Sequence, residues 1–185
     1  MKIDTSAIFS GKISFADATR DVKHADLYSM VNEIFDEIDS LLASASDAAV
    51  AFVSHDQAAI DQGEQGWTIG HVVAHMTASL EEATAAGAML ARGVELEGRL
   101  RYEVPWEELS TIQKVQARLQ ESRRMNRAFL DAWPDEPHLD ITITRIPRLG
   151  PMNAIATSAL GIGHGQTHLE QLREILRQYE LSKSL

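Results

Sequence analysis

Residues 67–90 read WTIGHVVAHMTASLEEATAAGAML and contain the clearest helical pattern in the chain. Apolar side chains recur there every three or four positions, at Ile69, Val72, Val73, Met76, Leu80, Ala83 and Leu90. This spacing predicts a long α-helix, because residues three and four apart share one helical face. Trp67 and Thr68 open the helix, and Gly93 and Gly98 end it.

Three further segments on either side of this helix have the same periodicity. They cover residues 27–49, 110–133 and 150–179. Ser110 is a favourable N-cap for the second of these segments. Pro151 marks the start of the third, because proline is favoured in the first turn of a helix.

Four long helices without internal repeats predict an all-α protein, a four-helix bundle. Residues 95–108 contain glycine and proline and have no lasting period, so we expect a long crossover between the second and third helices. Residues 138–147 alternate apolar and polar side chains, which predicts a short strand or an extended loop. No shift in composition marks a boundary, and we expect residues 1–185 to form one domain.

The composition restricts both partners and chemistry. The 185 residues include 17 Lys and Arg against 27 Asp and Glu, a formal charge of -10, and such a chain is a poor partner for nucleic acid or an anionic membrane surface. The first residues lack the apolar core of a secretory signal, and no run is long enough to cross a bilayer, so we expect a cytoplasmic protein. Because the chain has no cysteine, a metal site must use His, Asp or Glu.

Two pairs of histidines lie four residues apart on different predicted helices. His71 and His75 are on the second helix, and His164 and His168 are on the fourth. A spacing of four puts both imidazoles on one face, and bundles commonly hold metals between facing helices. On a helical wheel three of these rings lie at or near the apolar stripe, whereas His71 points away from it. We therefore predict a metal site of His75, His164 and His168, with hydrogen-bonded structural histidines as the alternative.

Other polar candidates have plainer interpretations. Three histidines in polar surroundings are expected at the surface: His24, His55 and His138. Glu81, Glu82 and Glu170 are candidates for a general base, but we expect them on solvated helix surface, because charged side chains are seldom buried unpaired. No HExxH, P-loop or GxGxxG motif is present, so zinc-protease and nucleotide-binding chemistry have no support.

The three tryptophans have different expected roles. Trp67 is expected to pack at the start of its helix, with a pocket wall as the alternative. Trp133 ends an apolar stripe and is expected in the core. Trp106 follows a proline in the expected crossover, and core, pocket wall and dimer contact all stay open for it.

Two segments resemble the DinB-like superfamily, also called the YfiT-like metal-binding four-helix proteins. Residues 67–76, WTIGHVVAHM, look like the opening of that family's second helix, in which a His follows a Trp by eight residues. Residues 164–172, HGQTHLEQL, look like its fourth-helix signature, with a Gln three residues after the second His. The order and separation of the segments also agree, over about residues 25–180. Glu170 departs from the family, because many members have Gly there.

The resemblance implies a bundle with a crossover, often a homodimer, in which His75, His164 and His168 hold a divalent metal, nickel or zinc in the first place. The resemblance does not make His71 a ligand and implies a position next to the three ligands. It also implies a transferase or isomerase acting on a small molecule with a low-molecular-weight thiol such as bacillithiol or mycothiol. A metal-dependent hydrolase and a metal-stabilised stress or binding protein without turnover stay open as alternatives. Imidazole ligands suit several metals, so the residues alone do not choose between them.

Overall fold

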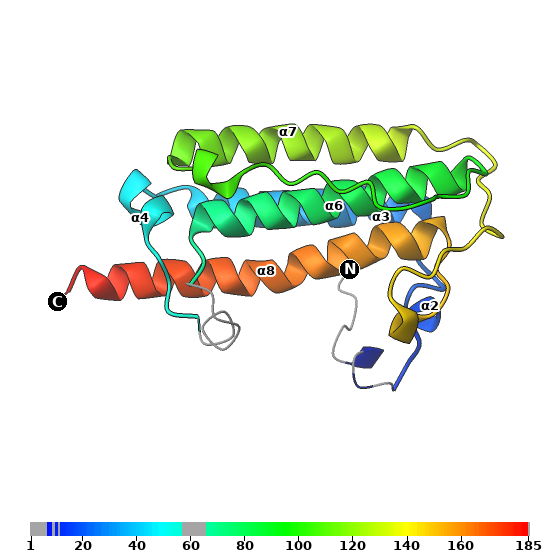
Figure 1. Ribbon diagram of the computed structural model, residues 1–185, viewed down its shortest axis with the longest axis horizontal. Helices are drawn as coiled ribbons and strands as arrows, with labels where there is room; N and C mark the ends of the chain where they lie inside the picture. The colour runs from blue at the N-terminus through cyan, green and yellow to red at the C-terminus, as the bar shows by residue number, and fades with distance from the viewer. Residues whose placement is uncertain (1–6, 9, 11, 57–65, 185) are drawn as a thin grey trace.

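The computed structural model describes residues 7–8, 10, 12–56 and 66–184. Four long helices form the bundle: α3 (His24–Leu42), α6 (Ile69–Ala91), α7 (Ile112–Asp131) and α8 (Ala154–Ser182) (Figure 1). The described residues outside the bundle helices include four short turns of helix: α2 (Phe15–Ala18) before α3, and α4 (Asp47–Ala51), η1 (Trp106–Glu108) and η2 (Pro147–Leu149) in the connections. The predicted all-α four-helix bundle is confirmed. Among the described helices, none has an apolar stretch long enough to cross a membrane.

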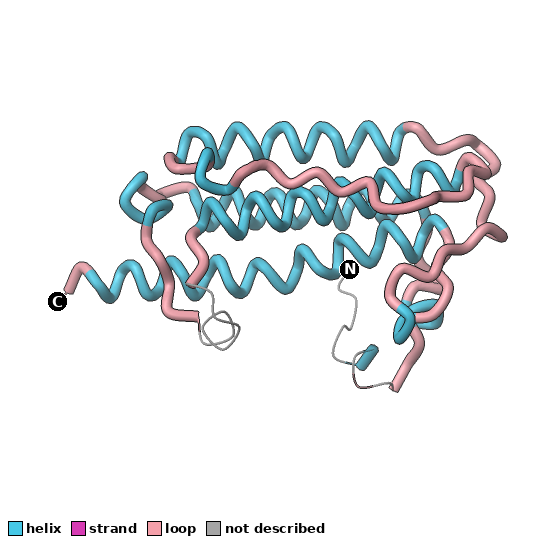
Figure 2. Tube along the Cα trace, viewed as in Figure 1, coloured by secondary structure: helices cyan, strands magenta, loops and turns pink. Residues whose placement is uncertain are grey.

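The expected crossover lies between α6 and α7. Residues 92–111 leave the end of α6, run back along the bundle and reach η1 before α7 begins (Figures 1 and 2). As a result α6 and α7 run in the same direction, and α3 and α8 run in the opposite one (Figure 1). The crossover therefore lies beside α6 over much of its length, where its side chains can reach those of the helix.

Helix α6 is the central element of the bundle. It packs against both α7 and α8, and most of its residues are buried, including Ile69, Met76 and Leu80. Its contact with α8 is close because small residues face each other. A Cβ added at Gly161 of α8 would lie only 2.3 Å from the Cβ of Ala83. This close approach brings the histidines of the two helices within reach of each other.

The starts of the last two bundle helices differ from the prediction. Helix α7 is capped by Thr111, whose side chain accepts from the backbone N–H of Lys114, so Ser110 is not the cap. Helix α8 begins at Ala154, after the cap Asn153, and not at Pro151. The cause is local: Met152 pairs with Ile143 in an isolated bridge, and the side chain of Asn153 accepts from the N–H of Ala156.

Two other sequence predictions need correction. The first long helix ends at Leu42 rather than continuing to residue 49, because Ser46 accepts from the N–H of Ala49 and starts the separate helix α4. In the segment 138–147 the only strand-like pairing within the described chain is an isolated bridge between Ile143 and Met152. The extended-loop alternative is therefore correct, and this loop closes over the bundle near the start of α8.

Candidate metal centre

Three imidazoles from two helices converge at one point. His75 is on α6, and His164 and His168 are on α8. The Nε2 atom of His164 lies 3.2 Å from Nε2 of His75 and 3.1 Å from Nε2 of His168. One nitrogen from each ring lies within 4.8 Å of the corresponding atoms of the other two. The structure thus brings together the three histidines selected from the sequence.

The spacing of these nitrogens fits a shared cation. Nitrogen ligands at 2.0–2.1 Å from a tetrahedral zinc ion lie about 3.3 Å apart, close to the two separations observed. A neutral imidazole nitrogen carries either one hydrogen or one lone pair, so Nε2 of His164 cannot form a full hydrogen bond with both neighbours. A divalent cation, by contrast, accepts a lone pair from each ring. The donor set therefore suits a metal better than it suits a hydrogen-bonded cluster.

The environment keeps these rings uncharged. Burial lowers the pKa of His75 to about 4, and the neighbouring His168 and Arg101 act in the same direction. The side chain of His164 is exposed at the cavity, but the protein around the rest of the ring desolvates it. This desolvation, followed by the other two rings, lowers the pKa of His164 to about 4. Burial also lowers the pKa of His168, although its hydrogen bond to Gln171 opposes this. All three imidazoles are neutral at pH 7, which is the protonation state that binds a metal.

The second nitrogen of His168 has a fixed partner. Its Nδ1 lies 2.9 Å from Oε1 of Gln171, an oxygen that can only accept, so Nδ1 carries the hydrogen. The amide nitrogen of Gln171 in turn donates to Oδ2 of Asp56 at 3.2 Å. This chain leaves the lone pair of His168 on Nε2, directed at the other two rings. Gln171 is the residue that follows His168 by three in the HGQTHLEQL segment.

The second nitrogen of His75 meets two residues of the crossover. Its Nδ1 lies 3.1 Å from Nη2 of Arg101 and 3.7 Å from Oε1 of Glu103. Arg101 also donates to Glu103 and to Oγ of Ser79, which ties the crossover to α6. A guanidinium can only donate, so Nη2 of Arg101 donates to Nδ1 and the hydrogen of this ring lies on Nε2. Ligation through Nε2 requires the hydrogen on Nδ1 instead, with Arg101 turned away and the carboxylate of Glu103 as the acceptor. The sequence analysis missed both residues, because nothing in the crossover pattern indicates which helix it touches.

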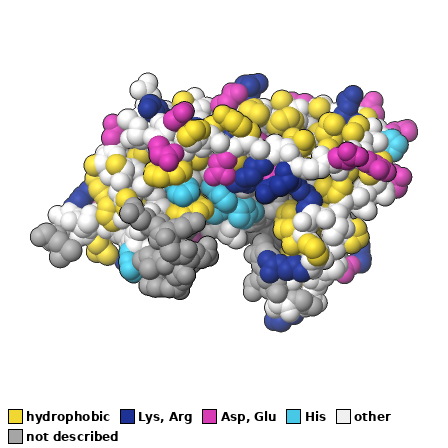
Figure 3. All heavy atoms as spheres, in the orientation of Figure 1, with side chains coloured by type: hydrophobic (Ala, Val, Ile, Leu, Met, Phe, Trp, Pro, Cys, Tyr) yellow, Lys and Arg dark blue, Asp and Glu magenta, His cyan; other side chains and the backbone are white. Residues whose placement is uncertain are grey.

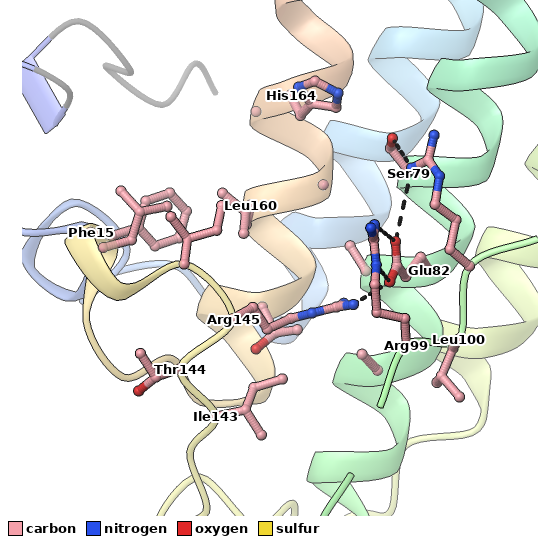
Figure 4. Close-up of a pocket in the computed structure, with 18 of the residues that line it drawn as sticks. Phe15, Ser79, Glu82, Arg99, Leu100, Ile143, Thr144, Arg145, Leu160 and His164 are labelled. Carbon is pink, nitrogen blue, oxygen red and sulfur yellow. Dashed lines mark hydrogen bonds and ion pairs between the residues drawn. The ribbon is translucent and has the colours of Figure 1, made fainter. Parts of the chain in front are cut away.

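A cavity of about 1140 Å³ opens beside His75 and His164 (Figure 4). It lies between α6, α8, the crossover and the loop before α8, and His164 is exposed to it. On the surface, histidine side chains lie next to Lys and Arg side chains in a recess of the face shown in Figure 3. Phe15, Ile143 and Leu160 contribute an apolar side to the cavity. The histidine cluster is therefore accessible to a small molecule.

Glu82 holds the charged side of the cavity together. Its buried carboxylate accepts from Nε and Nη2 of Arg99 at 3.0 and 2.9 Å, and also from Arg145 (Figure 4). Burial by itself would raise the pKa of Glu82, but the hydrogen bonds from Arg99 and Arg145 lower it below its usual value. The prediction of solvated surface is thus wrong for Glu82. Its partners come from the crossover and from the loop before α8.

The other two glutamate candidates lie away from the cavity. Glu81 is also buried, contrary to the prediction, because Nη2 of Arg118 on α7 lies 2.7 Å from its Oε1. Glu170 is exposed as predicted and pairs with Arg173 at 2.6 Å. Neither residue lines the cavity, so neither is placed to act on a molecule bound there.

Aromatic rings surround the cluster on its other side. His71 stacks between Trp67 and Trp106, with ring centroids 4.0 and 5.1 Å away. Trp67 also contacts His75 edge-on at 5.1 Å. His71 therefore lies beside the three converging rings without joining them. Trp67 packs at the start of its helix, as expected, and in addition contacts a candidate ligand.

The remaining histidines have structural or surface positions. His55 and His138 are exposed, as predicted. The surface prediction is wrong for His24, which is half-buried: its Nε2 lies 3.1 Å from the carbonyl oxygen of Leu130, and its ring stacks on Trp133 at 4.3 Å. Trp133 is buried in the core, as predicted.

Comparison with known proteins gives one match. A family model described as the DinB superfamily matches residues 31–172, most of the chain and all three converging histidines. No curated protein and no solved structure matches the chain.

Proposed function

Because this chain belongs to the DinB superfamily, we propose that it is a metal-dependent enzyme of the S-transferase or isomerase type, which uses a low-molecular-weight thiol as cosubstrate. The observation that supports this most is the convergence of three neutral imidazoles at the edge of an open cavity. Nickel or zinc is the metal we expect, because the resemblance to this family implies it. Bound there, a divalent metal supplies a Lewis acid that lowers the pKa of a thiol toward neutrality.

The protein's own residues have separate tasks in this proposal. His75, His164 and His168 hold the metal, and Gln171 fixes the ring orientation of His168. Glu103, 3.7 Å from Nδ1 of His75, would accept the hydrogen of that nitrogen in the metal-bound state, once Arg101, which donates to it in the structure, turns away. Because the chain has no cysteine, the reacting sulfur has to arrive on the cosubstrate through the cavity.

The described residues favour this reaction type over a hydrolase. A metal-dependent hydrolase needs a carboxylate or imidazole free to take a proton from water. Glu82, a candidate that lines the cavity, is held by two arginines with a lowered pKa, which makes it a poor base. A purely structural metal is also less well supported, since structural sites are closed and His164 is exposed.

The first experiment is elemental analysis of protein purified without a His tag. We expect close to one divalent metal per chain in the wild type and a loss of most of it in His75→Ala, His164→Ala and His168→Ala, because each removes one of three ligands. His138→Ala removes an exposed histidine outside the cluster and is the matched control. Full occupancy in both His75→Ala and His168→Ala would contradict the ligand assignment.

The second experiment measures turnover. The metal-loaded protein is incubated with bacillithiol, mycothiol or glutathione and a panel of electrophiles, and the loss of free thiol is followed. We expect loss that depends on added metal and disappears in His164→Ala. Hydrolysis of esters or amides without thiol consumption would instead identify a hydrolase. A protein that holds stoichiometric metal and does neither would refute the enzymatic proposal.

A further inference from the structure

The cavity beside the histidines carries the opposite charge to the protein as a whole. The chain has a formal charge of -10, yet four of its 17 basic residues line this one cavity: Arg99, Arg101, Arg145 and Arg148. Among the residues that the structure describes, Glu82 and Glu103 are the acidic ones that line it. The surplus of positive charge faces a space next to the exposed imidazole of His164, and charge of one sign in a low-dielectric cleft concentrates ligands of the other sign.

Glu82 fixes two of these arginines without using up their donors. The carboxylate accepts from Nε and Nη2 of Arg99 and from Nη2 of Arg145. A guanidinium carries five N–H groups, so both arginines keep further donors. Figure 4 shows both side chains extending into the same region around Glu82, below His164. Two guanidinium groups bound to the same carboxylate lie close together, and their remaining donors are suited to bind a second carboxylate through paired hydrogen bonds.

The opposite side of the cavity is apolar. Phe15 and Leu160 lie across from the arginines, and Ile143 lies below them (Figure 4). A ligand for this space therefore needs one anionic end and a hydrocarbon part. Glu82 supplies one negative charge to two guanidinium groups, so an uncharged ligand would leave the second positive charge uncompensated. A fully polar ligand would leave the apolar wall in water.

We infer that the cavity binds a small organic acid, with its carboxylate on Arg99 and Arg145 and its hydrocarbon part against Phe15 and Leu160. This inference rests on the proposed function, for which it names the substrate class: an organic acid whose reacting end points toward His164. The carboxylate contact itself is made by arginines outside the histidine cluster. It can therefore be tested in protein without metal.

The test is calorimetric titration with hexanoate and with hexanamide, which has the same chain length and no charge. Both probes are titrated into His164→Ala, where the metal cannot compete for the carboxylate. We expect hexanoate to bind at least about tenfold more tightly than hexanamide, the size of effect expected for hydrogen bonds to a charged group. Arg145→Gln, made in the same background, should remove most of this preference.

Arg124→Gln is the matched control for charge. Arg124 is an exposed arginine on α7 paired with Glu121, and its replacement changes the net charge equally. It should leave hexanoate affinity unchanged. If circular dichroism shows that Arg145→Gln does not fold, Arg99→Gln replaces it, since the Arg99 side chain is 68% exposed and its loss should not unfold the protein.

The outcomes separate this inference from the proposed function. Equal affinity for hexanoate and hexanamide, or equal hexanoate affinity in Arg99→Gln and Arg124→Gln, would overturn it. Hexanoate binding that requires the metal would also overturn it, because the carboxylate would then lie on the metal and not on the arginines. If hexanoate binds to His164→Ala as expected but the wild-type protein is found to hold no metal, only the metal proposal is refuted.

Discussion

His75 and His164 show how the fold prepares ligands before any metal is bound. An imidazole near pKa 6.5 is partly protonated at neutral pH, and a proton then competes with the metal. Burial lowers the pKa of both rings to about 4, so this competition is largely absent. The lowered pKa values have a consequence for stability. The unfolded chain takes up protons at these rings at a pH where the folded chain does not, so the free energy of unfolding must depend on pH.

The metal-free protein should therefore lose stability as the pH falls from about 6.5 toward 4. In this window the unfolded chain binds protons at His75 and His164 that the folded chain does not, so the free energy of unfolding decreases as the pH is lowered and recovers above about pH 6.5. The free energy of unfolding is measured by urea unfolding of chelator-treated protein at several pH values between about 6.5 and 4. The decrease should be smaller in His75→Ala, which lacks one such group.

Acidic residues also titrate in this range, so the comparison between variants decides the outcome. His138→Ala, which removes an exposed histidine, should keep the pH dependence of the wild type. If His75→Ala and wild type decline equally between about pH 6.5 and 5, the two rings are not protected from protons in the folded state.

The histidines could be found from the sequence, whereas their partners could not. The spacing of four residues and the position on a helical wheel depend only on the sequence of one helix. They were therefore enough to identify all three rings. Glu82 was assigned to the surface because a lone glutamate on a helix is usually solvated. Its burial depends on Arg145, 63 residues away, and on Arg99, 17 residues away, and only the folded crossover and loop bring them together.

At the scale of the helices, small residues set the distance between α6 and α8. Ala83 faces Gly161, and Gly87 faces Ser158, whose Oγ would lie 2.0 Å from an added Cβ. The two helices can therefore approach closely about one and two turns from His164 on α8, and about two and three turns from His75 on α6. Since those rings meet across the same interface, this packing fixes their separation.

Gly161→Ala should disturb this interface and Gly165→Ala should not. A Cβ at Gly161 lies 2.3 Å from Cβ of Ala83 and 3.1 Å from a backbone oxygen, so we expect the free energy of unfolding to fall by about 1–3 kcal/mol. A Cβ at Gly165 meets only side-chain carbons at 3.4–3.5 Å. There alanine should be neutral or stabilise by up to about 1 kcal/mol, since it is the better helix former.

Urea unfolding of the two variants measures the difference, and metal content provides a second readout. Because Gly161 lies one turn before His164, its replacement should also lower metal occupancy. Gly165 is adjacent to His164 in the chain, so a loss of metal in Gly165→Ala with full occupancy in Gly161→Ala would contradict the role assigned to helix packing.

The number and type of the helices could be predicted, but several of their ends could not. Long apolar periodicity identifies a helix because it reports the face that is buried. The ends depend on single hydrogen bonds, such as that from the N–H of Ala49 to Ser46 and that from the N–H of Ala156 to Asn153. Several Ser, Thr and Asn residues near each end can cap, and only the packed structure selects one.

At the scale of the whole molecule, the metal would connect two helices whose ligands are 89 residues apart in the chain. The bundle has a large core of its own, with buried side chains from all four long helices. Core and site are therefore separable: the core sets the fold, and the metal adds to its stability by binding only the folded state.

Removing the metal should lower the melting temperature without unfolding the bundle. Protein stripped with a chelator should keep its helical circular dichroism at 25 °C, because core burial does not depend on the site. Adding zinc or nickel at 100 times its dissociation constant should stabilise by about 2.7 kcal/mol. For a chain of this length that corresponds to a rise of roughly 5–10 °C in Tm.

His164→Ala is the control that separates this effect from nonspecific metal binding, because it keeps the core and lacks one ligand. Its Tm should not respond to added metal. A stripped wild-type protein that loses its helical signal at 25 °C would show instead that the fold depends on the metal, as in small zinc-dependent domains. That result would favour the metal-stabilised binding protein over the enzyme, because metals that are required for folding typically occupy closed sites, whereas a catalytic metal needs a position open to substrate.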